Sequence, residues 1–63
     1  MKKKDKIAHK MQRHLDRARQ GLASCYYYNP WKLDYENETW NALDEDGNLW
    51  REEGGQAYLA GTP

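Results

Sequence analysis

The stretch that decides the fold is ETWNALDEDGNLWREE, residues 38–53. Two short runs, each with one Trp and one Leu, flank a turn-forming cluster that ends in Gly47. This arrangement is typical of a β-hairpin. A three-residue loop over residues 45–47, a type I turn with Gly47 left-handed, would place Ala42 opposite Trp50.

The register of this hairpin decides which side chains share a face. The three-residue loop predicts one face with Trp40, Ala42 and Trp50, and an opposite face with Asn41, Leu43, Leu49 and Arg51. A two-residue loop would put the two Trp side chains on opposite faces, because a shift of one residue reverses the alternation. We therefore predict the three-residue loop, with a helix packed against the face that carries both Trp rings.

The segment that ends at Gly21 has a helical period. Its apolar residues recur at steps of four and three: Ile7, Met11, Leu15, Ala18 and Leu22. This spacing predicts an amphipathic helix, which we assign to residues 5–21, after a frayed basic N-terminus at residues 1–4. Gly21 is the predicted stop. Because Cys25 continues the apolar stripe, a helix that runs to Tyr26 is the alternative.

The patterns in the other segments are weaker. The aromatic run Cys25–Tyr28 predicts a short strand, closed at Asn29 because a residue before proline favours extended backbone. Residues 31–37 follow neither the helical nor the strand period, so they form a connector or a helical turn. Residues 56–60 form an edge strand or a loose tail, and residues 61–63 are tail.

Together these elements predict a single α+β domain over residues 1–63. One N-terminal helix packs on a small antiparallel sheet, which occupies residues 25–60 and is centred on the hairpin. A core of this size seldom supplies more than about 3–5 kcal/mol without a disulfide, a metal or a second subunit. Cys25 is the only Cys, so no intramolecular disulfide can form. No apolar run follows the N-terminal lysines. We therefore expect neither a signal peptide nor a membrane span, and we expect the protein in the cytoplasm.

Three patterns that suggest metal binding or catalysis have simpler explanations. When Gly47 is aligned with the sixth position of a calcium loop, Ala42 stands where the first oxygen ligand belongs. His9 and His14 point about 140° apart on a helix, so with Cys25 they do not make a tetrahedral zinc site. The sequence has no glycine-rich phosphate loop and no nucleophile motif. We therefore expect no cofactor, no metal site and no enzymatic activity.

The charges are divided sharply along the chain. The 10 Lys and Arg balance the 10 Asp and Glu, yet residues 1–24 carry a net charge of +6 and residues 25–63 carry −6. Four cations line one shoulder of the predicted helix: Lys6, Lys10, Arg13 and Arg17. Like charges at this spacing destabilise a helix by about 0.2–0.5 kcal/mol per pair. The row therefore predicts docking of the helix on the acidic sheet, within one chain or between two, or contact with an external polyanion.

Protein docking is the function that we expect from these features. Zero net charge and an acidic half disfavour nucleic acid, whereas Tyr and Trp commonly anchor protein interfaces. Eight aromatic residues exceed what a small core needs, so Tyr27 and Trp31 are expected to be exposed anchors, beside the four helix cations. We predict a small regulatory protein that binds a protein partner, in the style of bacterial or phage accessory proteins.

Two other partners remain open at this point. The alternative is nucleic-acid binding through the four helix cations, with Tyr26–Tyr28 stacked on bases. A homodimer is a further expectation, with the basic helix of one copy on the acidic hairpin of another. Added salt would loosen such a dimer, because salt screens charge pairs at a surface.

Overall fold

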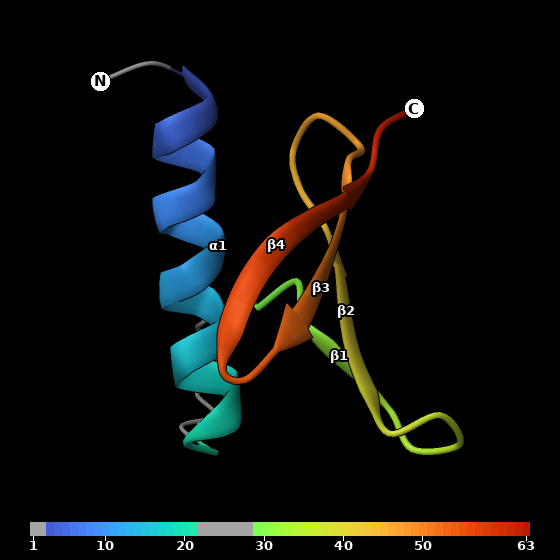
Figure 1. Cartoon of the computed structure of the whole chain (residues 1–63). Coiled ribbons are helices and arrows are strands. Elements are labelled where there is room, and N and C mark those ends of the chain that lie inside the picture. Colours follow the sequence, from blue (N-terminus) through green and yellow to red (C-terminus); the bar gives the residue numbers. More distant parts are fainter. Residues whose placement is uncertain (1–2, 22–28) are drawn as a thin grey trace.

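The computed structural model describes residues 3–21 and 29–63 of the chain. It contains the helix α1 (Lys3–Arg19) and the strands β1 (Lys32–Asp34), β2 (Thr39–Leu43), β3 (Leu49–Glu53) and β4 (Gln56–Gly61). The strands form an antiparallel sheet in the order β1-β2-β3-β4, so each strand pairs with the next along the chain. Figure 1 shows α1 on one side of the twisted sheet, beside β4. The predicted α+β fold is confirmed.

The helix α1 buries most of the apolar stripe that its sequence predicts, and Leu22, the last member of the stripe, lies outside the described residues. Ile7, Met11 and Leu15 are buried, and Ala18 packs against this core from a partly exposed position. The helix begins at Lys3, two residues before the predicted start, so the segment expected to fray is helical in part. The spacing of the apolar residues therefore set both the existence and the facing of the helix.

The end of α1 decides between the short and the long helix. The helix ends at Arg19, and Gly21 N donates a hydrogen bond to Ala18 O at 3.1 Å. Gly21 has a φ of 71°, a left-handed conformation that costs glycine little and that commonly ends helices. The predicted stop is therefore confirmed, and the helix that runs to Tyr26 is wrong. The predicted strand over residues 25–28 lies outside the described residues.

The β2–β3 hairpin has the predicted three-residue loop. Asp44 N donates a hydrogen bond to Asn48 O at 3.0 Å, and Gly47 N donates one to Asp44 O at 3.1 Å. Gly47 has a φ of 82°, the left-handed conformation that such a loop requires. In this register Ala42 pairs with Trp50, and both side chains are buried.

The face of the hairpin that packs on the core is also as predicted. Trp40 is partly buried and packs against the buried cluster, on the same face as Ala42 and Trp50. The alanine leaves room between the two large rings, and side chains of α1 belong to the same cluster. The packing of the helix against this face is therefore confirmed.

Residues 31–37, predicted as a connector or a helical turn, include a strand instead. Leu33 pairs with Trp40 and Asp34 pairs with Thr39, which makes β1 the edge of the sheet next to β2. The strand has only three residues, too few for alternation of polar and apolar side chains to be recognised in the sequence.

The C-terminal segment forms the strand β4, which decides between the two alternatives for residues 56–60. Trp50 pairs with Leu59, whereas Leu49 pairs with Gly61, so the register shifts by one residue at Ala60. Such a bulge bends the strand and increases its twist. The strand continues through Gly61, the first residue of the predicted tail.

Trp31 lies in the core, so its predicted exposure is wrong. Its side chain is 4% exposed, and Nε1 donates a hydrogen bond to the carbonyl oxygen of Met11 at 2.9 Å. Asn29 fixes the backbone that leads to Trp31 against α1, because its Oδ1 accepts a hydrogen bond from Trp31 N and its Nδ2 donates one to His14 O. A chain without Phe and with few aliphatic residues uses this ring to fill the core. The buried core comprises Ile7, Met11, Leu15, Trp31, Ala42 and Trp50.

Candidate functional site

The face of the sheet turned away from α1 carries exposed apolar side chains. The strand registers place these residues on it: Lys32, Asn41, Leu43, Leu49, Arg51 and Tyr58. Leu43 is 61% exposed and Tyr58 is 43% exposed. Leu43 pairs with Leu49, and Tyr58 pairs with Arg51 on the neighbouring strand. We call these six residues the outer sheet face, which includes the four that the hairpin register predicted.

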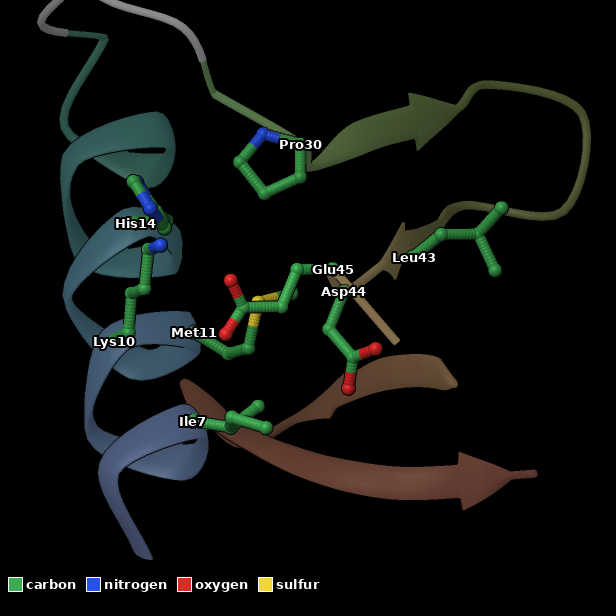
Figure 2. A pocket seen from close by; sticks show the side chains of 8 residues that line it. All are labelled: Ile7, Lys10, Met11, His14, Pro30, Leu43, Asp44 and Glu45. Atoms are coloured by element: carbon green, nitrogen blue, oxygen red, sulfur yellow. The ribbon is translucent and has the colours of Figure 1, made fainter. Parts of the chain in front are cut away.

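Leu43 stands between two hollows in the surface. One, of about 170 Å³, lies between α1 and the end of β2 (Figure 2), and the other, of about 280 Å³, lies along the start of β1. Both hollows are lined by Pro30 and Leu43. They exist because β1 begins at Lys32, opposite Asn41. The last two residues of β2 therefore extend past the first residue of β1 and have no neighbour in that strand. The exposed leucine is therefore a ridge with a depression on each side.

The hollow beside α1 combines apolar walls with ionisable groups. Ile7 and Met11 form part of its wall, and Figure 2 shows Lys10 and His14 of α1 facing Glu45 of the β2–β3 loop. Burial lowers the pKa of His14, and the neighbouring cations on α1 lower it further. His14 is therefore mostly neutral at pH 7, and the charges that line this hollow come from Lys10 and the acidic loop.

Asp44 also lines this hollow, but its carboxylate serves the hairpin. It accepts hydrogen bonds from Trp50 Nε1 at 2.7 Å, Asn48 Nδ2 at 2.9 Å, and the N–H groups of Asn48 and Asp46. Burial acts to raise the pKa of Asp44, but these hydrogen bonds outweigh it and hold the pKa below its ordinary value. Asp44 is therefore a structural anion, committed to four donors within the β2–β3 hairpin.

The hollows are small compared with the sites that hold substrates or cofactors. Such sites usually enclose about 300–1,000 Å³, whereas the hollow beside α1 has about 170 Å³ and is open to solvent. Within residues 3–21 and 29–63, no three His, Asp, Glu or Cys side chains gather as metal ligands would. The hollow beside α1 is suited to one side chain of a partner rather than to a whole small molecule.

The four helix cations, Lys6, Lys10, Arg13 and Arg17, form an exposed row on α1. At about 100° per residue, the row lies opposite Leu15, the most deeply buried residue of the helix. The basic helix does pack on the sheet of its own chain, and Arg19 Nε lies 3.5 Å from Glu52 Oε2. Of the four helix cations, Lys10 also lines the hollow beside the acidic β2–β3 loop and faces Glu45. Docking between two copies, or on an external polyanion, stays a prediction. We call the four residues the basic row.

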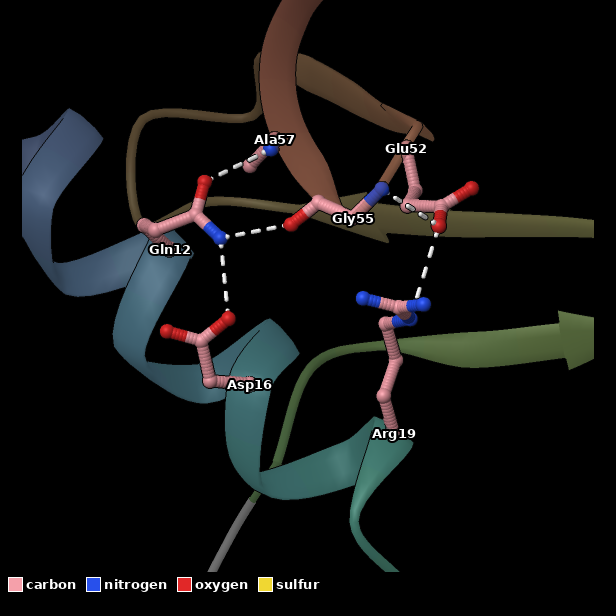
Figure 3. Close-up of polar contacts among 6 residues, drawn as sticks. All are labelled: Gln12, Asp16, Arg19, Glu52, Gly55 and Ala57. Carbon is pink, nitrogen blue, oxygen red and sulfur yellow. Dashed lines mark hydrogen bonds and ion pairs between the residues drawn. The ribbon is translucent and has the colours of Figure 1, made fainter.

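A polar seam joins α1 to the start of β4 (Figure 3). Gln12 Oε1 accepts a hydrogen bond from Ala57 N at 2.8 Å, and Gln12 Nε2 donates to Gly55 O at 2.9 Å. The same Nε2 donates to Asp16 Oδ1 at 3.0 Å. The side-chain amide thus satisfies edge groups of β4 as a neighbouring strand would, which protects that edge against pairing with another chain.

The sequence had pointed to only some of these residues. It predicted the basic row, which the structure keeps together and exposes, and Tyr27, which lies outside the described residues. It did not single out Gln12 or Tyr58. Tyr58 could have been found from its alternation with Ala57 and Leu59 if β4 had been assigned, whereas no sequence signal distinguishes Gln12 from an ordinary polar residue on the side of a helix.

Comparisons with protein-family models, with curated proteins and with solved structures give no significant match to this chain. Among the described residues, no helix combines the length and the apolar character needed to cross a membrane.

Proposed function

We propose that this protein is a small, non-catalytic regulatory protein of the cytoplasm that docks on a protein partner, in the style of bacterial or phage accessory proteins. The observation that carries the proposal is the outer sheet face, with Leu43 at 61% and Tyr58 at 43% exposure. Large apolar side chains grouped on one exposed face are characteristic of interaction surfaces.

The chemistry of the outer sheet face favours a protein over other partners. Tyr58 and Arg51 pair across β3 and β4, and Tyr and Arg are among the residues that contribute most to protein interfaces. Leu43 and Leu49 supply an apolar centre beside them. The depression along the start of β1, lined by Lys32, Asn41 and Leu43, gives this surface the relief that shape-complementary packing requires.

The rigidity of the sheet also supports the proposal. The opposite face of the same strands holds Ala42 and Trp50 in the core, so the outer side chains project from a backbone that is already ordered. An interface built on such a scaffold loses less conformational entropy on binding than one built on a loop.

The test begins with capture of a partner from a nuclease-treated lysate of the native host, followed by surface plasmon resonance with the purified partner. Tyr58→Ala is expected to weaken binding by about 2 kcal/mol or more, mainly through faster dissociation. Leu43→Ala is expected to weaken it by a smaller amount. Tyr35→Ala is the matched control, because Tyr35 is 83% exposed in the β1–β2 turn, away from this face.

Three outcomes would contradict the proposal. Equal weakening by the Tyr35 and Tyr58 variants, or no weakening by either, would show that the outer sheet face is not the docking surface. Capture that disappears on nuclease treatment would favour nucleic acid as the primary partner. Sedimentation of the purified protein is measured first, because a dimer dissociated by Tyr58→Ala would identify the partner as a second copy of the chain.

A further inference from the structure

We propose that the basic row, Lys6, Lys10, Arg13 and Arg17, is a second binding site, which holds the phosphate backbone of duplex nucleic acid without reading its sequence. Lys6, Arg13 and Arg17 lie apart from the outer sheet face, because they are exposed on α1, which packs on the inner face of the sheet. Lys10 also lines the hollow that Leu43 borders. The inference therefore goes beyond protein docking and makes the molecule a bridge between two partners.

The geometry of the basic row fits a linear polyanion. Its members follow one another at steps of four, three and four residues, so at about 100° per residue they lie within roughly 60° of one line along the helix. At about 1.5 Å per residue, the row is about 16 Å long. Phosphates on one strand of duplex DNA are spaced by about 3.4 Å along the axis, so the row spans a length of duplex that carries several phosphates.

Two members of the basic row, Lys6 and Arg13, are available for an external anion. In the part of the chain that the structure describes, neither forms an ion pair or a hydrogen bond through its side chain. Of the nearby acids, Asp16 accepts a hydrogen bond from Gln12, and Glu45 faces Lys10 across the hollow. The four like charges repel one another, and a bound polyanion removes that cost.

Two further observations favour a phosphate backbone over an acidic protein surface. The row contains no apolar or aromatic side chain, so it offers neither the anchors of a protein interface nor the stacking platforms that hold single strands. The β1–β2 turn, with Glu36 and Glu38, lies on the far side of the sheet from α1 in Figure 1. These two acids therefore do not face a duplex that lies along α1.

The experiment measures fluorescence anisotropy of labelled 20-base-pair DNA duplexes of two unrelated sequences. Each phosphate contact releases condensed counterions, so the logarithm of the association constant should fall with that of the salt concentration with a slope of about −3 to −4. Between about 50 and 200 mM salt this is a loss of about 100-fold in affinity. Both duplexes should bind equally, because backbone contacts carry no sequence information.

The variant that tests the row is Lys6→Gln with Arg13→Gln. It should flatten the salt slope by about 2 and reduce the loss over the same range to about 10-fold. The matched control is Lys32→Gln with Arg51→Gln, which removes the same charge from the outer sheet face. The control should bind DNA with a slope close to that of the unmodified protein, and circular dichroism should show both variants folded.

Equal losses in the two double variants would overturn the proposal, because net charge alone would then govern binding. Equally strong binding to a poly-glutamate peptide of the same charge would overturn it in favour of an acidic protein partner. Failure here is separable from failure of the protein-docking proposal, because Tyr58→Ala is expected to leave DNA binding unchanged. Conversely, the Lys6 and Arg13 variant is expected to leave the dissociation rate of the protein partner unchanged.

Discussion

The first two hairpin turns of the sheet, β1–β2 and β2–β3, use the same device at their first residue. In the β1–β2 turn, Asp34 accepts hydrogen bonds from the N–H groups of Glu36 and Asn37 and from Asn37 Nδ2. In the β2–β3 loop, Asp44 accepts from the N–H groups of residues 46 and 48 and from Asn48 Nδ2. Asp is well suited to this role, because its short carboxylate reaches the N–H groups of the residues that follow.

The turns differ in what else holds them. Asp44 also accepts from Trp50 Nε1 at 2.7 Å, so the second turn is tied to a ring in the core. Among the described residues, the hydrogen-bond partners of Asp34 all lie within its own turn. The left-handed position is Gly47 in the second turn and Glu38, with a φ of 55°, in the first. The β2–β3 loop is therefore coupled to the core and unstrained, whereas the β1–β2 turn is held locally and is strained at Glu38.

The variant expected to disrupt the coupling between the second turn and the core most strongly is Trp50→Ala. Truncation of a buried aromatic ring costs about 3–5 kcal/mol, which is comparable with the whole stability expected of so small a domain. We expect the variant to be largely unfolded by circular dichroism at 25 °C. Trp50→Phe is the matched variant, because it keeps an aromatic ring in the core but lacks the indole N–H that binds Asp44; it should melt cooperatively at a reduced temperature. A native melt for Trp50→Ala would contradict the assignment of this face to the core.

The next effect separates the two turns directly. Asp44→Ala should lower the free energy of unfolding by about 1–3 kcal/mol, because the half-buried indole N–H of Trp50 loses its partner. Asp34→Ala should lower it by less, since the groups it releases are exposed and can bind water. Urea melts of both variants compare the two. A larger loss for Asp34→Ala would refute the coupling of the second turn to the core.

The same features explain how far the sequence could be read. The second turn was predictable because Gly47 marks a left-handed position between two strand-like runs, and the three-residue loop then fixed which face Trp50 occupies. The first turn was not, because Glu38 hides its left-handed position and β1 is only three residues long. The burial of Trp31 was missed for the same reason. Because β1 was not assigned, nothing in the sequence indicated that Trp31 lies on the same inner face of the sheet as Leu33.

The basic row and the outer sheet face show a similar division. The helical period alone placed Lys6 and Arg13 on one line, since α1 is long and regular. Leu43 was placed on the correct face by the hairpin register. Its unusual exposure depends on where β1 begins, which no local pattern specifies. Contacts between distant segments, such as Gln12 with Ala57, were invisible for the same reason.

The turns should also respond to acid. The pKa of Asp34 is lowered, mainly by the side-chain hydrogen bond from Asn37, and the pKa of Asp44 is lowered by hydrogen bonds that outweigh its burial. Because both folded-state pKa values lie below the ordinary value of 3.8, the stability they contribute is fully present above pH 3.8. It is lost as the pH falls through the folded-state values.

Urea melts between about pH 2 and 5 measure this loss, against the ordinary carboxyl range. Asp44→Asn should make the fall of the unfolding free energy with decreasing pH shallower, because one of the two titrating groups is removed. Asp34→Asn should do the same for the first turn. An unchanged acid slope in both variants would show that neither carboxylate is linked to folding.

The smallest effect concerns the strained position of the first turn. Glu38 in the left-handed region costs about 1–2 kcal/mol relative to a residue without a Cβ, and Glu38→Gly removes that cost. The added freedom of glycine in the unfolded chain offsets about 0.4–1 kcal/mol of the gain, so we expect a net stabilisation of about 1 kcal/mol or less.

Gly47→Ala is the reverse experiment at a φ of 82°. The nearest atom to its new Cβ is Pro63 Cγ at 3.7 Å, so the expected loss arises from the backbone conformation alone. Thermal melts should move in opposite directions for the two variants, and destabilisation by Glu38→Gly would show that the first turn is not strained.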